Sequence, residues 1–143
     1  MMHIGPPRVL IVEDDPDTLV IMRVNLRAAG IEPILASDGS TAMARIEAEQ
    51  PDAVILDVLL PGIDGWEVLE ALHELGDPVP VIICSGKKNP HDILRAEELG
   101  AVAYLVKPFD IDRLLDVTAE AVSQRRPVID LEPRLGVQGI DPA

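Results

Sequence analysis

Five short, mainly apolar segments divide the chain at regular intervals. They occupy residues 8–12, 31–36, 53–57, 79–84 and 101–106. Short apolar segments with turn residues near their ends are typical of strands that are buried on both faces of a parallel sheet. Their alternation with longer segments predicts an α/β fold in which helices cover both faces of the sheet through right-handed crossovers.

The longer segments carry residues that begin and end helices. Asp15 and Asp110 are suited to cap a helix, Pro16 to occupy a first helical position, and Gly30 and Gly100 to follow a last turn. We predict helices at about 16–29, 40–50, 64–75, 90–99 and 111–126. Helical spacing predicts that the last one buries Ile111, Leu114, Leu115, Ala119 and Val122.

The second strand contains Pro33. Proline has no amide hydrogen to donate to a neighbouring strand, so a strand that contains it is expected at the edge of the sheet. No repeat or second domain is visible in the 143 residues. We therefore predict a leader at 1–7, one domain at 8–126 and a tail with proline and glycine at 127–143.

Composition narrows the classes of partner. Twenty-five acidic residues against 12 basic ones give a net charge of −13. This charge repels nucleic acid and anionic membranes, so neither is expected as a direct partner, whereas a divalent cation or a basic protein surface is compatible. A single cysteine, Cys84, favours a reducing cytoplasm, and no apolar stretch is as long as a membrane span.

Polar side chains follow four of the predicted strands. Glu13 and Asp14 follow the first strand, Asp57 ends the third, Ser85 follows the fourth and Lys107 follows the fifth. The carboxyl ends of parallel strands share one edge of the sheet, so these groups should meet there. Three carboxylates together are unfavourable without a cation, and Mg²⁺ prefers such oxygen ligands. The sequence thus predicts a Mg²⁺ site beside a hydroxyl and an ammonium group.

This set of groups suits phosphoryl transfer. An aspartate such as Asp57 can form an acyl phosphate, while Mg²⁺ and Lys107 neutralise charge and Ser85 donates to a phosphate oxygen. Neither GxxxxGK[ST] nor GxGxxG occurs, so the phosphoryl donor is expected to come from another molecule. Alone, Asp57 would be an ordinary turn aspartate, and Asp15 and Asp64 are better explained as helix caps.

Four ordered motifs resemble the CheY-like receiver domain of two-component response regulators. The resemblance covers about residues 8–126, and the ordered set is much more specific than any single motif. The motifs are Leu10-Ile11-Val12-Glu13-Asp14-Asp15-Pro16, Leu56-Asp57-Val58-Leu59-Leu60-Pro61-Gly62-Ile63-Asp64-Gly65, Ser85-Gly86 and Tyr104-Leu105-Val106-Lys107-Pro108-Phe109.

The resemblance implies a metal site and a phosphoacceptor. Asp57 would accept the phosphoryl group and, with Glu13, Asp14 and the backbone carbonyl of Leu59, would bind Mg²⁺. Asp14 would be the more direct ligand. Glu13 stands where the family often has aspartate, and its longer side chain is compatible with contact to the metal through water.

The resemblance also implies a switch and a fold. Ser85 would be the switch hydroxyl, Tyr104 the switch aromatic and Lys107 the phosphate partner. The Lys107–Pro108 peptide would be cis. The sheet would be the flavodoxin-like, doubly wound, five-stranded one with strand order 2-1-3-4-5, which agrees with the edge position expected from Pro33. From the residues alone, Lys87 and Lys88 are interpreted as a solvated patch, although their loop follows Ser85 and could meet the acidic surface of a partner.

A receiver of this kind is a signalling switch that catalyses its own phosphorylation and dephosphorylation and is not otherwise an enzyme. The expected donor is a phosphohistidine of a sensor kinase or phosphotransfer protein. Phosphorylation of Asp57 would alter a face built from the fourth helix, fifth strand and fifth helix, which would bind an output protein. The expected assembly is a monomer or a weak dimer in the cytoplasm.

Three other readings stay open. The chain could be an interaction scaffold of the same fold that does not use phosphate, although all the site groups are present. A metal-dependent phosphatase would need an acid soon after the nucleophile, and Val58-Leu59 supplies none. The chain could also be the receiver part of a longer transcription factor or signalling enzyme.

Overall fold

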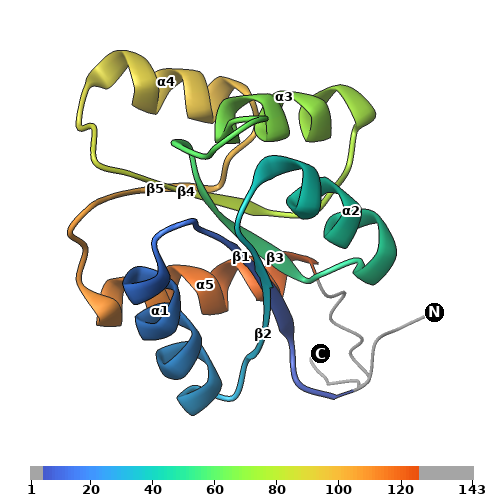
Figure 1. Cartoon of the computed structure of the whole chain (residues 1–143), viewed down its shortest axis with the longest axis vertical. Helices are drawn as coiled ribbons and strands as arrows, with labels where there is room; N and C mark the ends of the chain where they lie inside the picture. The colour runs from blue at the N-terminus through green and yellow to red at the C-terminus, as the bar shows by residue number, and fades with distance from the viewer. Residues whose placement is uncertain (1–4, 126–143) are drawn as a thin grey trace, which may run out of the picture.

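A computed structural model describes residues 5–125, in which five strands alternate with five helices around one sheet (Figure 1). The sheet order is β2-β1-β3-β4-β5, and all four strand pairs are parallel. The predicted doubly wound α/β fold is therefore confirmed. The elements are β1 (Arg8–Val12), α1 (Pro16–Ala28), β2 (Glu32–Ala36), α2 (Gly39–Glu49), β3 (Ala53–Asp57), α3 (Gly65–Leu75), β4 (Val81–Ser85), α4 (Pro90–Glu98), β5 (Ala103–Val106) and α5 (Ile111–Arg125).

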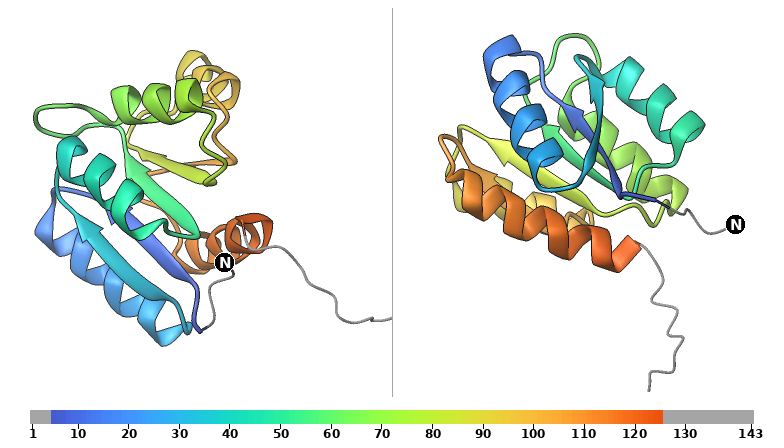
Figure 2. Two further views of the ribbon diagram at one scale, coloured as in Figure 1. Left: turned by 90° about the vertical axis from the view of Figure 1, so that its right-hand side faces the viewer. Right: turned by 90° about the horizontal axis from the view of Figure 1, so that it is seen from below.

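Helices cover both faces of the sheet (Figure 2). On each face, an apolar layer of buried side chains lies between the sheet and its helices. Successive side chains of a strand point to opposite faces, so Leu10 packs toward α2, α3 and α4, whereas Val9 packs toward α1 and α5. β1 and β3 lie inside the sheet and are buried almost throughout. This double burial explains why their sequences are continuous apolar runs without alternation.

The edge position of β2 is confirmed. Its only neighbour is β1, with Pro33 opposite Val9 in the register. Proline costs no hydrogen bond when its nitrogen faces away from the neighbouring strand. The leader at 1–7 and the tail at 127–143 stay predictions, because residues 1–4 and 126–143 lie outside the described part.

Three strands begin later than expected: β2 begins one residue later, and β4 and β5 each begin two residues later. The predicted segment 79–84 is β4, Val81–Ser85, and the predicted segment 101–106 is β5, Ala103–Val106. The side chain of Asp77 accepts a hydrogen bond from the amide of Val79 at 2.9 Å. Val79 therefore belongs to the loop before β4, despite its apolar side chain. The strand ends that carry polar groups are as expected.

The buried face of α5 differs from the prediction at several positions. Ala119 is exposed, and Ile111 and Leu115 are half-buried. The residues of α5 that are buried but were not in the predicted set are Val117, Thr118 and Ala121. The hydroxyl of Thr118 donates to the carbonyl of Leu114 at 2.7 Å, so its only polar group is satisfied within the helix. A threonine can therefore occupy a core position of α5 that the apolar pattern did not include. Leu114 and Val122 are buried as predicted.

Helix caps lie where the sequence indicated. Asp15 caps α1 by accepting from the amide of Thr18 at 3.0 Å. Asp64 caps α3 in a capping box, in which its carboxylate accepts from the Glu67 amide and the Glu67 carboxylate accepts from the Asp64 amide. Both residues thus have the structural role that was preferred over a role in chemistry.

Asp64→Ala is expected to lower the free energy of unfolding by about 1 kcal/mol, because it leaves amides of the first turn of α3 without a partner. Urea unfolding of the wild type and the variant measures the difference. Asp64→Asn retains a capping oxygen and serves as the control. Equal stabilities of wild type and Asp64→Ala would contradict this role.

No helix within residues 5–125 combines the length and apolar character needed to cross a membrane.

Candidate functional site

The polar groups that follow the strands gather at one edge of the sheet. β1, β3, β4 and β5 are parallel, and their carboxyl ends bring together Glu13, Asp57, Ser85 and Lys107. Three of these side chains are buried: Glu13 is 2% exposed, Asp57 6% and Ser85 1%. Buried polar groups require partners, so their contacts define the site.

Lys107 joins the two buried carboxylates. Its Nζ lies 2.7 Å from Glu13 Oε1 and 3.0 Å from Asp57 Oδ2. The other oxygen of each carboxylate accepts a backbone hydrogen bond, from Asp15 at 3.1 Å and from Leu59 at 3.0 Å. One ammonium therefore compensates two carboxylates brought together from strands far apart in the sequence.

Burial and charge shift the pKa values of this pair. Burial raises the pKa of the Glu13 carboxyl above its ordinary value of 4.5, and the hydrogen bond from Lys107 reduces this rise without cancelling it. Burial alone would lower the pKa of Lys107, but its hydrogen bonds to Glu13 and Asp57 outweigh burial and raise the pKa above 10.5. Lys107 is thus a cation throughout the neutral range.

Glu13→Gln is expected to change how stability depends on pH. The pKa of Glu13 is higher in the folded chain than its ordinary 4.5, so between these values the folded state binds more protons than the unfolded state. The stability that Glu13 contributes is fully present below pH 4.5 and falls as the pH rises through the folded pKa. The fall is about 1.4 kcal/mol for every pH unit that separates the two pKa values.

Urea unfolding in metal-free buffer between about pH 4 and pH 8 tests this dependence. The stability of the wild type minus that of Glu13→Gln should decrease as the pH rises. A difference that stays constant or grows would contradict the raised pKa.

Three carboxylates are arranged to hold a cation. Glu13, Asp14 and Asp57 each present an oxygen, and these oxygens lie within 4.8 Å of one another. Asp14 is exposed and has no hydrogen-bond or ion-pair partner among residues 5–125, whereas both oxygens of Glu13 are already engaged. An all-oxygen set of this kind fits Mg²⁺, which binds through one or two carboxylates and retains water. Asp14 is the group best able to ligate directly.

The loop after β3 packs closely against the end of that strand. The amide of Gly65 donates to the carbonyl of Val58 at 3.0 Å, and a Cβ on Gly65 would overlap the carbonyl oxygen of Asp57. Leu59 contributes its amide to Asp57, and its side chain is 60% exposed. The sequence analysis assigns no role to Gly65, because a glycine required by a close backbone contact looks the same in a sequence as a glycine required by a turn. Its contact with the backbone of Asp57 places it beside the candidate site.

The backbone of one residue, Lys87, links Ser85 to Tyr104. The amide of Lys87 donates to Ser85 Oγ at 3.0 Å, and the carbonyl of Lys87 accepts from the Tyr104 hydroxyl at 2.7 Å. The sequence predicts only side-chain roles for Lys87, in a solvated patch or against the acidic surface of a partner. Its role here belongs to the backbone, so its side-chain type carries no signal for it.

One further expectation is confirmed, because the Lys107–Pro108 peptide is cis. Cys84 is a buried member of β4, and burial raises the pKa of its thiol to about 12, which removes it as a nucleophile at neutral pH.

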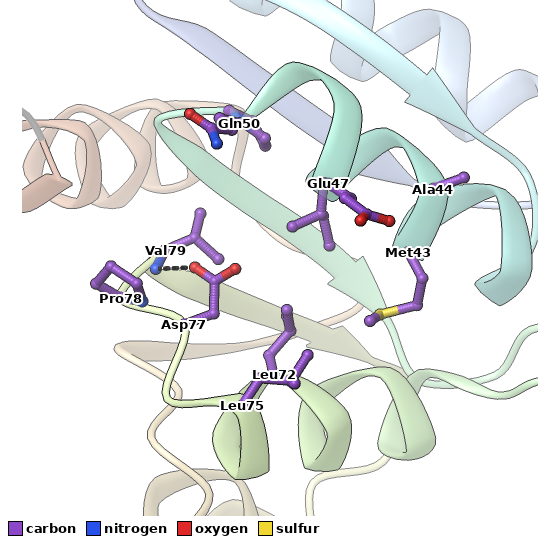
Figure 3. A pocket seen from close by; sticks show the side chains of 11 residues that line it. Met43, Ala44, Glu47, Gln50, Leu72, Leu75, Asp77, Pro78 and Val79 are labelled. Carbon is purple, nitrogen blue, oxygen red and sulfur yellow. Dashed lines mark hydrogen bonds between the residues drawn. The ribbon is translucent and has the colours of Figure 1, made fainter. Parts of the chain in front are cut away.

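A separate groove lies between α2 and α3, away from the carboxylates (Figure 3). Its volume is about 490 Å³, and its lining includes Met43, Leu72, Leu75 and the segment Asp77–Val79. These residues come from the two helices and from the loops that precede β3 and β4, so the groove is at the opposite end of the strands from Asp57. The clustered carboxylates, and not this groove, therefore mark the chemical site.

Comparisons with known proteins agree with this geometry. The family described as "Response regulator receiver domain" matches residues 9–119. The chain is 37% identical over 123 residues to "Transcriptional regulatory protein PrrA" of Mycobacterium leprae, covering 86% of this chain and 52% of that protein. It is 43% identical over 108 residues to "Transcriptional activator protein IrlR" of Burkholderia pseudomallei, covering 76% and 47%. The chain spans about half the length of these curated relatives.

Solved structures show the same fold. The receiver domain of the Francisella response regulator 1452 superposes with a TM-score of 0.81 at 28% identity, covering 84% of this chain and 99% of that one. A CheY-like receiver domain protein from Methanospirillum hungatei gives 0.79 at 29% identity, covering 85% and 97%. The family match over residues 9–119, the relatives and the fold lead to one conclusion: this chain belongs to the response regulator receiver domain family.

Proposed function

We propose that Asp57 accepts a phosphoryl group from a phosphohistidine of a sensor kinase or phosphotransfer protein. An oxygen of the Asp57 carboxylate forms a bond to phosphorus, and the phosphorus–nitrogen bond to the donor breaks. The electron pair of that bond returns to the imidazole, which leaves as neutral histidine when its other nitrogen carries a proton. The product is an aspartyl phosphate on this chain.

The observation that carries the proposal is the position of Lys107. Its ammonium group contacts Asp57 Oδ2 at 3.0 Å while Glu13 holds it from the other side at 2.7 Å. The cation is thereby fixed where negative charge develops on a transferring phosphoryl group. Mg²⁺ held by Asp14, Asp57 and the carbonyl of Leu59, with Glu13 directly or through water, would neutralise further charge on the phosphoryl oxygens.

The same site supports a switch. Ser85 is buried beside Asp57 in the sheet and uses its hydroxyl oxygen as an acceptor from Lys87, which leaves its hydrogen for a phosphoryl oxygen. Phosphorylation adds roughly two negative charges at Asp57, and movement of Ser85 toward them pulls on the backbone amide of Lys87. Tyr104 donates to the backbone carbonyl of the same residue, so the change reaches the face formed by α4, β5 and α5. An output protein would bind there.

The names of PrrA and IrlR describe proteins about twice the aligned length, so we take only the receiver function from them. We propose no DNA contact for this 143-residue chain, because its net charge of −13 repels phosphate. A scaffold that does not use phosphate would have no need to hold a lysine between two buried carboxylates, and burying them costs free energy.

Incubation with Mg²⁺ and acetyl phosphate, followed by intact-mass spectrometry, tests the proposal. The wild type should gain the mass of one phosphoryl group, Asp57→Ala should gain none, and chelation of Mg²⁺ should prevent the gain. A wild-type chain that gains no phosphoryl group and binds no beryllofluoride would favour the scaffold reading.

A further inference from the structure

Among the five described helices, α4 is the least buried. Ala96 is its only buried residue, and Ile93 and Leu94 are 39% and 53% exposed. By contrast, α3 buries four residues and begins with a capping box. A helix with little buried apolar surface costs little free energy to displace, so specific side-chain contacts have a large share in fixing its position.

Arg95 supplies such contacts. Its guanidinium lies 4.3 Å from the centre of the Trp66 ring, and its Nη2 lies 3.0 Å from Glu70 Oε2. Trp66 and Glu70 are four residues apart on α3, so they share one face of that helix. A planar guanidinium can stack on an aromatic ring and pair with a carboxylate at the same time, which a lysine does less well.

These contacts join α4 to the segment that packs on the phosphoacceptor. Trp66 directly follows Gly65, the residue whose Cα lies against the carbonyl of Asp57. The amino end of α4 follows the loop in which the backbone amide and carbonyl of Lys87 bond Ser85 and Tyr104. Arg95 therefore fixes a helix whose amino end is attached directly to the proposed switch.

We propose that Arg95 is a positioning residue of the switch, because it holds α4 against α3 through Trp66 and Glu70 in the unphosphorylated chain. This inference rests on the proposed function. A ligand that favours a displaced α4 must break the contacts of Arg95 when it binds. Removal of Arg95 lowers that cost, so the phosphoryl analogue binds more tightly to the variant.

Titration of the Mg²⁺-loaded protein with beryllofluoride, followed by ¹⁹F NMR, tests the proposal. Arg95→Ala should bind roughly three- to tenfold more tightly than the wild type, given the usual strengths of a cation–π contact and a half-exposed ion pair. Glu70→Gln, which preserves side-chain shape, should give a smaller shift in the same direction. It keeps the test valid if Arg95→Ala folds poorly.

Arg45→Ala is the matched control. Arg45 also pairs with a glutamate, Glu49 at 2.5 Å, but both lie on α2. The affinity of Arg45→Ala for beryllofluoride should equal that of the wild type. Trp66 is the only tryptophan in the sequence, so tryptophan fluorescence reports on its surroundings alone. Beryllofluoride should change this fluorescence in the wild type, where Arg95 leaves the ring, and should change it less in Arg95→Ala, where the contact is already absent.

Equal or weaker binding by both Arg95→Ala and Glu70→Gln would overturn the role of Arg95 while leaving the proposed function intact. Absence of binding by every form, the wild type included, would overturn the proposed function and this inference with it.

Discussion

Lys107→Ala is expected to slow the phosphorylation of Asp57 by a factor on the order of 10² to 10³, the usual effect of removing one preorganised charge from a transferring group. In the wild type the ammonium is held 3.0 Å from Asp57 Oδ2. Alanine also leaves Glu13 and Asp57 as buried carboxylates without a cation between them. Both effects oppose the approach of a negatively charged phosphoryl donor.

The rate is measured from the gain in intact mass with acetyl phosphate at saturating Mg²⁺. Lys107→Arg is the control, because it keeps the charge while changing its geometry, and it should retain part of the activity. A rate for Lys107→Ala within a factor of about two of the wild type would show that Lys107 has only a structural role.

Gly65→Ala is expected to lower the free energy of unfolding by about 1–3 kcal/mol or more, as overpacking does in a tight contact. The new Cβ would overlap the carbonyl oxygen of Asp57 and the Cα of Val58. Both atoms belong to the backbone, which cannot rotate away as a side chain can. The displaced strand end should also slow phosphorylation of Asp57.

Gly86→Ala is the matched control for stability, since a Cβ there meets nothing within 4 Å. Urea unfolding of the three proteins separates the local clash from the general effect of replacing glycine in a loop. If Gly65→Ala and Gly86→Ala unfold at the same urea concentration, the close contact with Asp57 has no energetic consequence.

Much of the fold could be predicted because it depends on patterns that the chain itself carries. Buried parallel strands require continuous apolar runs, and Pro33 identifies an edge strand. The same logic brought Glu13, Asp57 and Lys107 to one edge. Because strand polarity alone determines which ends meet, no knowledge of side-chain conformation was needed.

Details that depend on backbone contacts could not be predicted. Val79 is as apolar as a strand residue, but its amide is bound by the side chain of Asp77. Thr118 enters the core because its hydroxyl finds a carbonyl within the same helix. The backbone of Lys87 links Ser85 to Tyr104 through an amide and a carbonyl, a pair of groups that every residue except proline possesses.

The different roles of Glu13 and Asp14 could not be predicted from the sequence either. The sequence shows two adjacent acids, and only their surroundings distinguish them. Glu13 is buried and holds Lys107, whereas Asp14 is exposed and free to ligate. This difference agrees with the expectation that the longer side chain of Glu13 contacts a metal less directly.

The assignment of Asp57 as the phosphoacceptor is tested most directly by locating the phosphoryl group among the three clustered acids. Borohydride reduces an acyl phosphate to an alcohol, so treatment after acetyl phosphate marks the modified residue for tandem mass spectrometry. If Asp57 is the phosphoacceptor, homoserine will replace Asp57, and Glu13 and Asp14 will be unchanged. Reduction at Glu13 or Asp14, or at no residue in a correctly folded chain, would contradict the assignment of Asp57 as the phosphoacceptor.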